Sequence, residues 1–277
     1  EHDNQTQYLA WDWIGNASVF GQQHDLLLGI DTERVDNFRG DTYRGPAVAG
    51  FNIYRPVYGN LAEPSLISTV QSDRSDELHS RSLYIKDNWH LNEQWILVAG
   101  GRYQHFEQLV EQGRGSSYAK TTDRQDNSFL PFAGLVYQLN QQVSLYGNYS
   151  RSFVPNASDA DTGQAFDPEQ GRSYELGIKL DLGNALTASA AVFDIEKENV
   201  VVSNNGTSQA AGKVGSQGVE IDISGRIAER WELLGTYAYT DTEILDDPDN
   251  RGNELVNAAQ NIASLYLTHH LALPSDA

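Results

Sequence analysis

Three segments decide the fold: FLPFAGLVYQLNQQVSLYGNYSRSF (129–153), RSYELGIKLDLGNALTASAAVFDIEKENVVV (172–202) and GSQGVEIDIS (215–224). Apolar and polar side chains alternate in each of them. In the third segment, for example, Val219 and Ile221 alternate with Glu220 and Asp222. Successive side chains of a β-strand point to opposite faces, so these segments predict strands with one apolar and one polar face.

Two all-β architectures accommodate such strands. A soluble sandwich buries the apolar face, whereas a transmembrane barrel turns it toward lipid and lines its lumen with the polar face. The same alternation predicts strands at residues 6–19, 24–38, 74–90, 95–112, 127–138, 143–152, 172–182, 186–203, 213–225, 231–243 and 259–272. All of these segments are longer than the five or six residues typical of soluble strands, which favours the barrel.

The connections support the same choice, because short and long ones alternate. The short ones are residues 20–23, 91–94, 139–142, 183–185 and 226–230, and the long ones are 39–73, 113–126, 153–171, 204–212 and 244–258. Short turns at one end and long loops at the other are typical of outer-membrane barrels. We therefore predict an antiparallel transmembrane β-barrel, here an incomplete one of about eleven strands, as a single partial domain over residues 1–277.

Aromatic residues recur at a spacing that fits a membrane. Three predicted strands each carry two of them eight residues apart: Trp95 and Tyr103, Phe129 and Tyr137, Trp231 and Tyr239. Eight residues span about 26 Å along a strand. A tilt of about 40° reduces this to roughly 20 Å of height, close to the apolar band between two aromatic girdles. The alternative is that aromatic residues are common in any strand.

Composition narrows the function. The chain of 277 residues has 19 basic and 38 acidic residues, and its net charge of -19 argues against nucleic acid as a partner. It has no cysteine, and no run of 18 apolar residues that would make a transmembrane helix. It also has no methionine, so we expect an excerpt of a longer protein. No catalytic motif such as G-x-S-x-G or a P-loop is present, so we do not expect an enzyme.

A family resemblance adds to this reading. It is carried by residues 82–103, 132–156, 166–179 (FDPEQGRSYELGIK), 190–201, 215–225 and 233–244. Together these segments resemble the barrel of TonB-dependent outer-membrane ferric-siderophore receptors, such as the ferrichrome receptor. The resemblance covers nearly the whole chain. One departure lies in residues 257–271, where Ala259 occupies a position at which the family usually has proline.

The resemblance implies a 22-stranded barrel in the Gram-negative outer membrane, plugged by an N-terminal globular domain. It implies that a ferric siderophore binds at the extracellular loops as transported ligand, without a cofactor. It also implies that the TonB energy-coupling complex acts through an N-terminal region. The plug, the coupling box and the first and last strands are not in this chain, which should neither close nor transport alone.

A candidate ligand loop spans residues 39–60 (RGDTYRGPAVAGFNIYRPVYGN). Its candidate contacts are Arg39, Tyr43, Arg44, Tyr54, Arg55 and Tyr58. Arginine grips anionic oxygen groups, and aromatic side chains provide stacking area at low entropic cost. Ferric siderophores are often anionic and rich in aromatic rings. The alternative is a long loop that packs on its own aromatic residues.

The strand parity also predicts a set of lumen-facing charges. They are Arg102, Glu175, Lys179, Glu220 and Asp222. These side chains would meet the plug or water, and simple solvation is the reading we prefer. No metal site is predicted. The acidic string 247–252 resembles a calcium loop, but Arg251 holds its fifth position and Ala258 replaces the closing glutamate. The histidines show no zinc pattern.

Two alternatives remain open from the sequence. One is a TonB-dependent receptor for another cargo, such as cobalamin, haem or a glycan, which uptake under iron starvation would distinguish. The other is a soluble β-rich enzyme or lectin with its apolar face inward, which would not need detergent.

Overall fold

The structure is a computed structural model. It describes residues 2–40, 54–56, 73–113, 117–156, 159, 165–183, 185–204, 207–247 and 249–271. Within these ranges the chain forms eleven strands: β1 (His2–Val19), β2 (Gln22–Arg39), β3 (Asp73–His90), β4 (Trp95–Gly113), β5 (Ala119–Gln138), β6 (Val143–Val154), β7 (Glu169–Asp181), β8 (Leu186–Asn204), β9 (Thr207–Ala228), β10 (Trp231–Asp246) and β11 (Asn261–His269). Each predicted strand is found, which confirms the all-β class.

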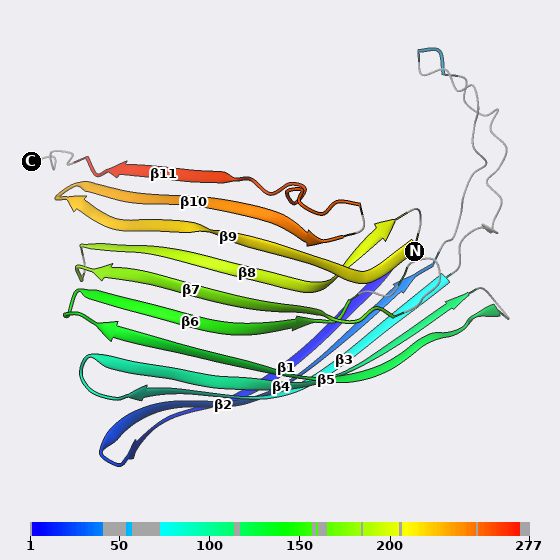
Figure 1. Ribbon diagram of the computed structural model, residues 1–277, viewed down its shortest axis with the longest axis horizontal. Helices are drawn as coiled ribbons and strands as arrows, with labels where there is room; N and C mark the ends of the chain where they lie inside the picture. Colours follow the sequence, from blue (N-terminus) through cyan, green and yellow to red (C-terminus); the bar gives the residue numbers. More distant parts are fainter. Residues whose placement is uncertain are drawn as a thin grey trace, which may run out of the picture.

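The eleven strands form one sheet in chain order, and each is antiparallel to the next. Figure 1 shows a curved wall with β1 and β11 at its two open edges. β1 pairs only with β2, and β11 only with β10, so the described strands do not close into a barrel. None of the described residues forms a helix long and apolar enough to cross a membrane.

The register divides the wall into two faces. The face we call the polar face carries Asp31, Arg102, Glu175, Lys179, Glu220 and Asp222. The opposite one, the apolar face, carries Trp95, Leu135, Leu176, Ile178, Val219 and Ile221. No second layer of the described chain covers the apolar face: Leu176 is 63% and Ile221 45% exposed. The soluble sandwich is therefore wrong for this chain.

Two short turns share one sequence pattern and one hydrogen-bond arrangement. Residues 91–94 read LNEQ and residues 139–142 read LNQQ. In the first, Asn92 Oδ1 accepts bonds from the backbone N–H groups of Gln94 (2.8 Å) and Trp95 (2.9 Å). In the second, Asn140 does the same for the equivalent residues. An asparagine that caps its own turn in this way fixes a tight connection between two strands.

The turn between β1 and β2 is tight for a different reason. Phe20 and Gly21 are its two residues, and both have positive φ, 51° and 79°. Two consecutive residues of that kind make the hairpin turn whose twist matches the flanking strands.

The five short connections all lie at one end of the wall, which we call the turn end, and the other end is the loop end.

The predicted bounds of two long loops are wrong, because both loops are shorter than expected. Residues 119–126 belong to β5, and β8 and β9 continue through most of residues 204–212 and leave only 205–206 between them. The reason is visible in the sequences AKTTDRQD and NNGTSQAAG, which have no apolar alternation. Their backbones nevertheless continue the ladder, as the partners Val110 and Thr122 and the partners Ser203 and Ser208 show.

Candidate functional site

The polar face holds an ion pair that links non-neighbouring strands. Arg102 of β4 donates from Nη1 and Nη2 to the two carboxylate oxygens of Asp31 in β2, at 2.6 and 2.8 Å. Its guanidinium also lies 5.4 Å from the centre of the Tyr84 ring. The Tyr84 hydroxyl donates to Asp12 of β1. The Asp31 side chain is only 2% exposed, so its charge depends on this two-point partner.

The Tyr84 ring lies flat on the wall because its direct cross-strand partner is Gly29. A Cβ atom at Gly29 would lie 2.2 Å from the ring, so only glycine leaves the space. The same arrangement recurs at three other strand pairs of the polar face. The pairs are Gly100 with Phe132, Gly177 with Tyr146, and Gly218 with Phe193. Because these rings lie against the wall, they do not project into the space in front of the polar face.

A hollow of about 650 Å³ lies on the polar face at β5–β7. Phe132 and Tyr146 contribute two of the flat rings to its lining. Glu175 and Lys179 bring opposite charges to it, and the Lys179 ammonium lies 5.3 Å from the centre of the Tyr146 ring. Aromatic rings and charges of both signs, including Lys86 of β3, therefore line this hollow.

The five predicted lumen charges thus share one face, and they divide into groups. Arg102 is paired with Asp31, and Glu175 and Lys179 line the hollow at β5–β7. Glu220 and Asp222 lie on the same face of β9. That this face lines a lumen stays a prediction, as does the role of the five residues.

The predicted ligand loop is described only in part. Arg39 is exposed at the end of β2, Tyr54 is 89% exposed, and Arg55 is exposed. Tyr43, Arg44 and Tyr58 lie outside the described residues. The described part does not bring the six residues together, and their contact with a ligand stays a prediction.

The acidic loop after β10 is ordered by its own backbone. Asp247 Oδ1 accepts bonds from the N–H groups of Asp249 (2.9 Å) and Asn250 (2.7 Å). These bonds, with that of Asp249 the largest contribution, lower the pKa of the Asp247 carboxyl below its ordinary value. Among the described residues no group of three or more His, Cys, Asp or Glu side chains could hold a metal ion.

The apolar face carries the aromatic pairs that the eight-residue spacing predicted. Trp95 and Tyr137 are direct partners with ring centres 4.4 Å apart, and Tyr103 and Phe129 are direct partners farther toward the loop end. The two rows therefore lie at two heights on the same face. Two such rows are the arrangement expected of the two aromatic girdles of a transmembrane barrel.

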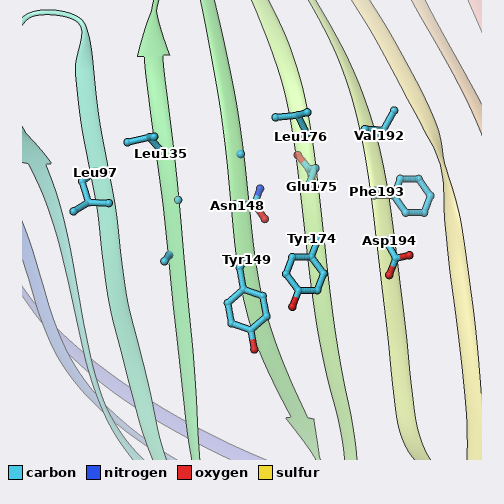
Figure 2. A pocket seen from close by; sticks show the side chains of 13 residues that line it. Leu97, Leu135, Asn148, Tyr149, Tyr174, Glu175, Leu176, Val192, Phe193 and Asp194 are labelled. Carbon is cyan, nitrogen blue, oxygen red and sulfur yellow. The ribbon is translucent and has the colours of Figure 1, made fainter.

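Between these heights the apolar face has a hollow of about 600 Å³ (Figure 2). Gly147 contributes no side chain to it, while Leu135, Leu176 and Val192 flank the space. The rings of Tyr149 and Tyr174, 5.0 Å apart, lie at one end of the hollow.

Several residues that matter in the structure were missed from the sequence. Asp31 and Tyr84 could have been assigned to the polar face by parity alone, since they alternate with Ile30 and Leu83. Their pairing with Arg102 could not, because it depends on register between strands far apart in the chain. Arg124, which contacts the β6–β7 connection, lies in a stretch that was predicted to be a loop.

A single-layered antiparallel wall with one apolar and one polar face has the architecture expected of part of a transmembrane barrel. The chain matches the family model "TonB dependent receptor-like, beta-barrel" over residues 1–275. It therefore belongs to this family, whose members are receptors of the Gram-negative outer membrane.

Named relatives fit this assignment. The chain is 35% identical over 277 residues to the metal-pseudopaline receptor CntO of Pseudomonas aeruginosa strain UCBPP-PA14, covering 95% of this chain and 38% of that protein. It is 28% identical over 262 residues to the ferrioxamine B receptor of Salmonella typhimurium, covering 92% and 36%. The chain thus spans less than two fifths of these relatives. Both are receptors, which supports the prediction that the chain is not an enzyme.

Solved structures show the same fold. The ferric-catecholate import receptor Fiu from Escherichia coli K12 matches with a TM-score of 0.78 at 20% identity, over 97% of this chain and 42% of that one. The unliganded ferric citrate transporter FecA matches with a TM-score of 0.78 at 21% identity, over 96% and 40%.

Proposed function

We propose that this chain is part of the wall of an outer-membrane receptor that binds a ferric siderophore at its extracellular loops and imports it by TonB-coupled gating. The family match over residues 1–275 carries the proposal. Relatives named as receptors for ferric pyoverdine, ferrioxamine B and ferrichrome support a siderophore as cargo. In this proposal the energy-coupling complex acts through a region outside this chain.

The two faces of the wall support the location. Leu176, Ile178 and Ile221 would contact lipid, which removes the cost of about 25 cal/mol per Å² that exposed apolar surface carries in water. The polar face would line the passage, where water or an inserted domain satisfies Glu220 and Asp222. Fractionation of cells that express the complete receptor should place it in the outer membrane, and extraction should require detergent.

Uptake by whole cells tests the cargo. Iron-starved cells with and without the gene for the complete receptor are offered ⁵⁵Fe complexes of ferrioxamine B, ferrichrome and pyoverdine. We expect receptor-dependent accumulation of at least one complex, abolished when TonB is deleted. Accumulation of none of them, with cobalamin, haem or a glycan taken up instead, would contradict the siderophore proposal.

A second cargo has a specific observation in its favour. The relatives at 34% and 35% identity, from two strains of Pseudomonas aeruginosa, are named metal-pseudopaline receptors, whereas the named ferric-siderophore receptors match at 27–28%. We therefore propose a metal chelate of the pseudopaline type as the alternative. Uptake of ⁶³Ni- or ⁶⁵Zn-pseudopaline, compared with ⁵⁵Fe-siderophores in the same cells, distinguishes the two cargoes.

A further inference from the structure

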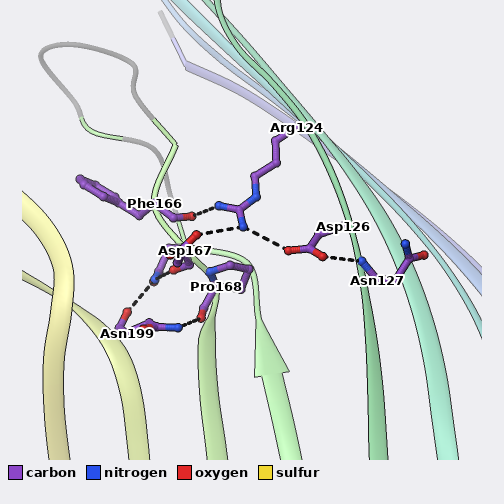
Figure 3. A network of polar contacts seen from close by, with 8 residues as sticks. Arg124, Asp126, Asn127, Phe166, Asp167, Pro168 and Asn199 are labelled. Carbon is purple, nitrogen blue, oxygen red and sulfur yellow. Dashed lines mark hydrogen bonds and ion pairs between the residues drawn. The ribbon is translucent and has the colours of Figure 1, made fainter.

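The described residues of the connection between β6 and β7 lie against the polar face at the loop end. Arg124 of β5 donates from Nη1 to the Phe166 carbonyl at 2.7 Å and from Nη2 to the Asp167 carboxylate at 3.1 Å (Figure 3). Asp126, two residues along the same strand, holds the guanidinium from the other side at 3.1 Å. Bonds from an ionised donor are about twice as strong as neutral ones.

A second anchor comes from β8. Asn199 Nδ2 donates to the Pro168 carbonyl at 2.9 Å, and Asn156 Nδ2 donates to the carbonyls of Asp167 (2.6 Å) and Asn199 (2.8 Å). Asn199 has a φ of 59° and interrupts the register of β8 between Glu198 and Val200. Asparagine tolerates this conformation better than most residues, and the bulge re-aims its amide toward the connection.

The other side of the connection is held by buried donors. Gln108 Nε2 donates to the Asn156 carbonyl at 3.2 Å, and Arg74 Nη1 donates to the Asp159 carbonyl at 2.9 Å. Gln108 and Arg74 are 8% and 6% exposed. The Phe153 ring, at the end of β6, lies 5.3 Å from the fully buried Phe106 ring. Anchors thus come from β3, β4, β5 and β8.

We propose that residues 155–156 and 165–168, which we call the ledge, are a fixed part of the polar face and that Arg124 is the residue that positions them. This rests on the proposed function, since it takes the polar face as the wall of the passage. A metal chelate would then pass a fixed edge at the loop end of the polar face. Without Arg124, the Phe166 carbonyl and the Asp167 carboxylate would form hydrogen bonds with water instead. The ledge would then be free to move.

Pulsed electron–electron double resonance on the complete receptor tests whether the ledge is fixed. Cysteines that carry nitroxide labels replace Ala165 on the ledge and Thr240 on the polar face of β10. This chain contains no cysteine, so labels report only these sites once cysteines elsewhere in the receptor are replaced. We expect one narrow distance distribution in the labelled parent and at least a twofold broader one in Arg124→Ala.

Three further variants sharpen the result. Asn199→Gly accommodates the positive φ but removes the amide, and it should broaden the distribution less than Arg124→Ala. Arg124→Lys retains a charged donor and should restore part of the narrowing. Arg34→Ala is the matched control, because Arg34 pairs with Asp36 and Glu77 on the apolar face and does not touch the ledge.

The outcomes are distinct. A broad distribution in the parent, or a narrow one in Arg124→Ala, would overturn the proposal. A lower melting temperature of Arg124→Ala with an unchanged distance would also overturn it, because Arg124 would then stabilise the wall without positioning the ledge. Neither measurement uses cargo. An uptake experiment that contradicted the proposed function would therefore not change what these measurements say about the ledge.

Discussion

Arg102 compensates a carboxylate that the wall nearly buries. Replacing Arg102 with alanine leaves the Asp31 charge, 2% exposed, without its two-point partner. Because an uncompensated buried charge is costly, we expect Arg102→Ala to lower the free energy of unfolding of the complete receptor by about 3 kcal/mol. Urea unfolding in detergent, followed by tryptophan fluorescence, measures the change.

The control for this prediction is an exposed arginine whose carboxylate partner has a second cation. Arg172 is 50% exposed and donates to Glu196 at 2.8 Å, and Glu196 also pairs with Lys213, so Arg172→Ala should cost less than about 1 kcal/mol. The double variant Asp31→Asn with Arg102→Ala should recover much of the loss, since the buried charge is then removed. Equal losses for both single arginine variants would contradict the argument.

The flat rings of the polar face give a second prediction at this scale. A Cβ at Gly177 would lie 2.4 Å from the Tyr146 ring, so Gly177→Ala must lift the ring off the wall. We expect a loss of about 1–3 kcal/mol in unfolding free energy, as for other overpacked sites. In Gly147→Ala the new Cβ would have its nearest neighbour, Leu176, at 3.5 Å, and this variant should be nearly neutral. The same urea experiment compares the two variants.

Side-chain parity accounts for what the sequence could say about the site. Within a strand, alternation alone assigns Arg102, Glu175 and Asp222 to the polar side. Contacts between strands need the register, and Arg102 reaches Asp31 only because β2, β3 and β4 are aligned as they are. The residue pattern of a single strand does not reveal this register between strands.

At the scale of single elements, the turns at residues 91–94 and 139–142 share one arrangement, in which an asparagine side chain accepts hydrogen bonds from the backbone of its own turn. Asn140→Ala removes the acceptor for the backbone N–H groups of Gln142 and Val143. We expect a loss of about 1 kcal/mol in unfolding free energy, since water replaces these exposed bonds only in part. Asn140→Asp keeps the acceptor and should be close to the parent, and Gln141→Ala should change little. A neutral Asn140→Ala would show that strand pairing alone fixes the turn.

The loop after β10 gives a pH-dependent prediction. The pKa of Asp247 is lowered in the folded loop, so the order that it supplies is present above the ordinary pKa of 3.8 and is lost as pH falls through the lower folded value. A nitroxide at Val256, which is 87% exposed in this loop, should therefore become more mobile under acid. Its electron paramagnetic resonance line shape reports the change. In Asp247→Asn this acid-induced step should be absent, and its persistence would contradict the assignment.

Element boundaries were harder to predict than the elements themselves. The apolar alternation ends where a strand leaves the membrane-spanning band, although the backbone ladder continues. Residues 120–126 are polar on both faces and still pair with β4 through partners such as Phe106 and Asp126. Sequence reasoning that uses apolar periodicity therefore finds the part of each strand that would face lipid and misses the part beyond it.

At the scale of the whole molecule, the wall owes its form to pairing between sequence neighbours. Each strand contacts the next one along the chain, and only Phe106 and Val110 are fully buried among the described hydrophobic residues. Because the described wall buries so few of its own hydrophobic side chains, we expect it to be most stable when lipid covers its apolar face and water or an inserted domain covers its polar face. The exposed apolar side chains are consistent with that environment and would be a liability in water.

Strand parity restricts how this wall can close. An odd number of antiparallel strands leaves β1 and β11 running in the same direction. Joining them within one chain, or between two copies that keep their loops on one side, would require a parallel pair. Further strands, odd in number, are needed to close the wall with antiparallel pairs alone. All residues of β1 and β11 except Ala17 are exposed, as expected of strands at the open edges of a sheet.

We therefore expect residues 1–277 alone to fail to form a closed barrel in detergent, whereas the complete receptor should form one. A closed barrel migrates faster than its boiled form in SDS gels, so heat modifiability measures closure. The isolated chain should show one heat-insensitive band and should aggregate through its edges, since unpaired backbone groups are costly in an apolar environment. A compact, heat-modifiable monomer of the isolated chain would show that β1 and β11 pair in parallel, and would contradict the argument from strand parity.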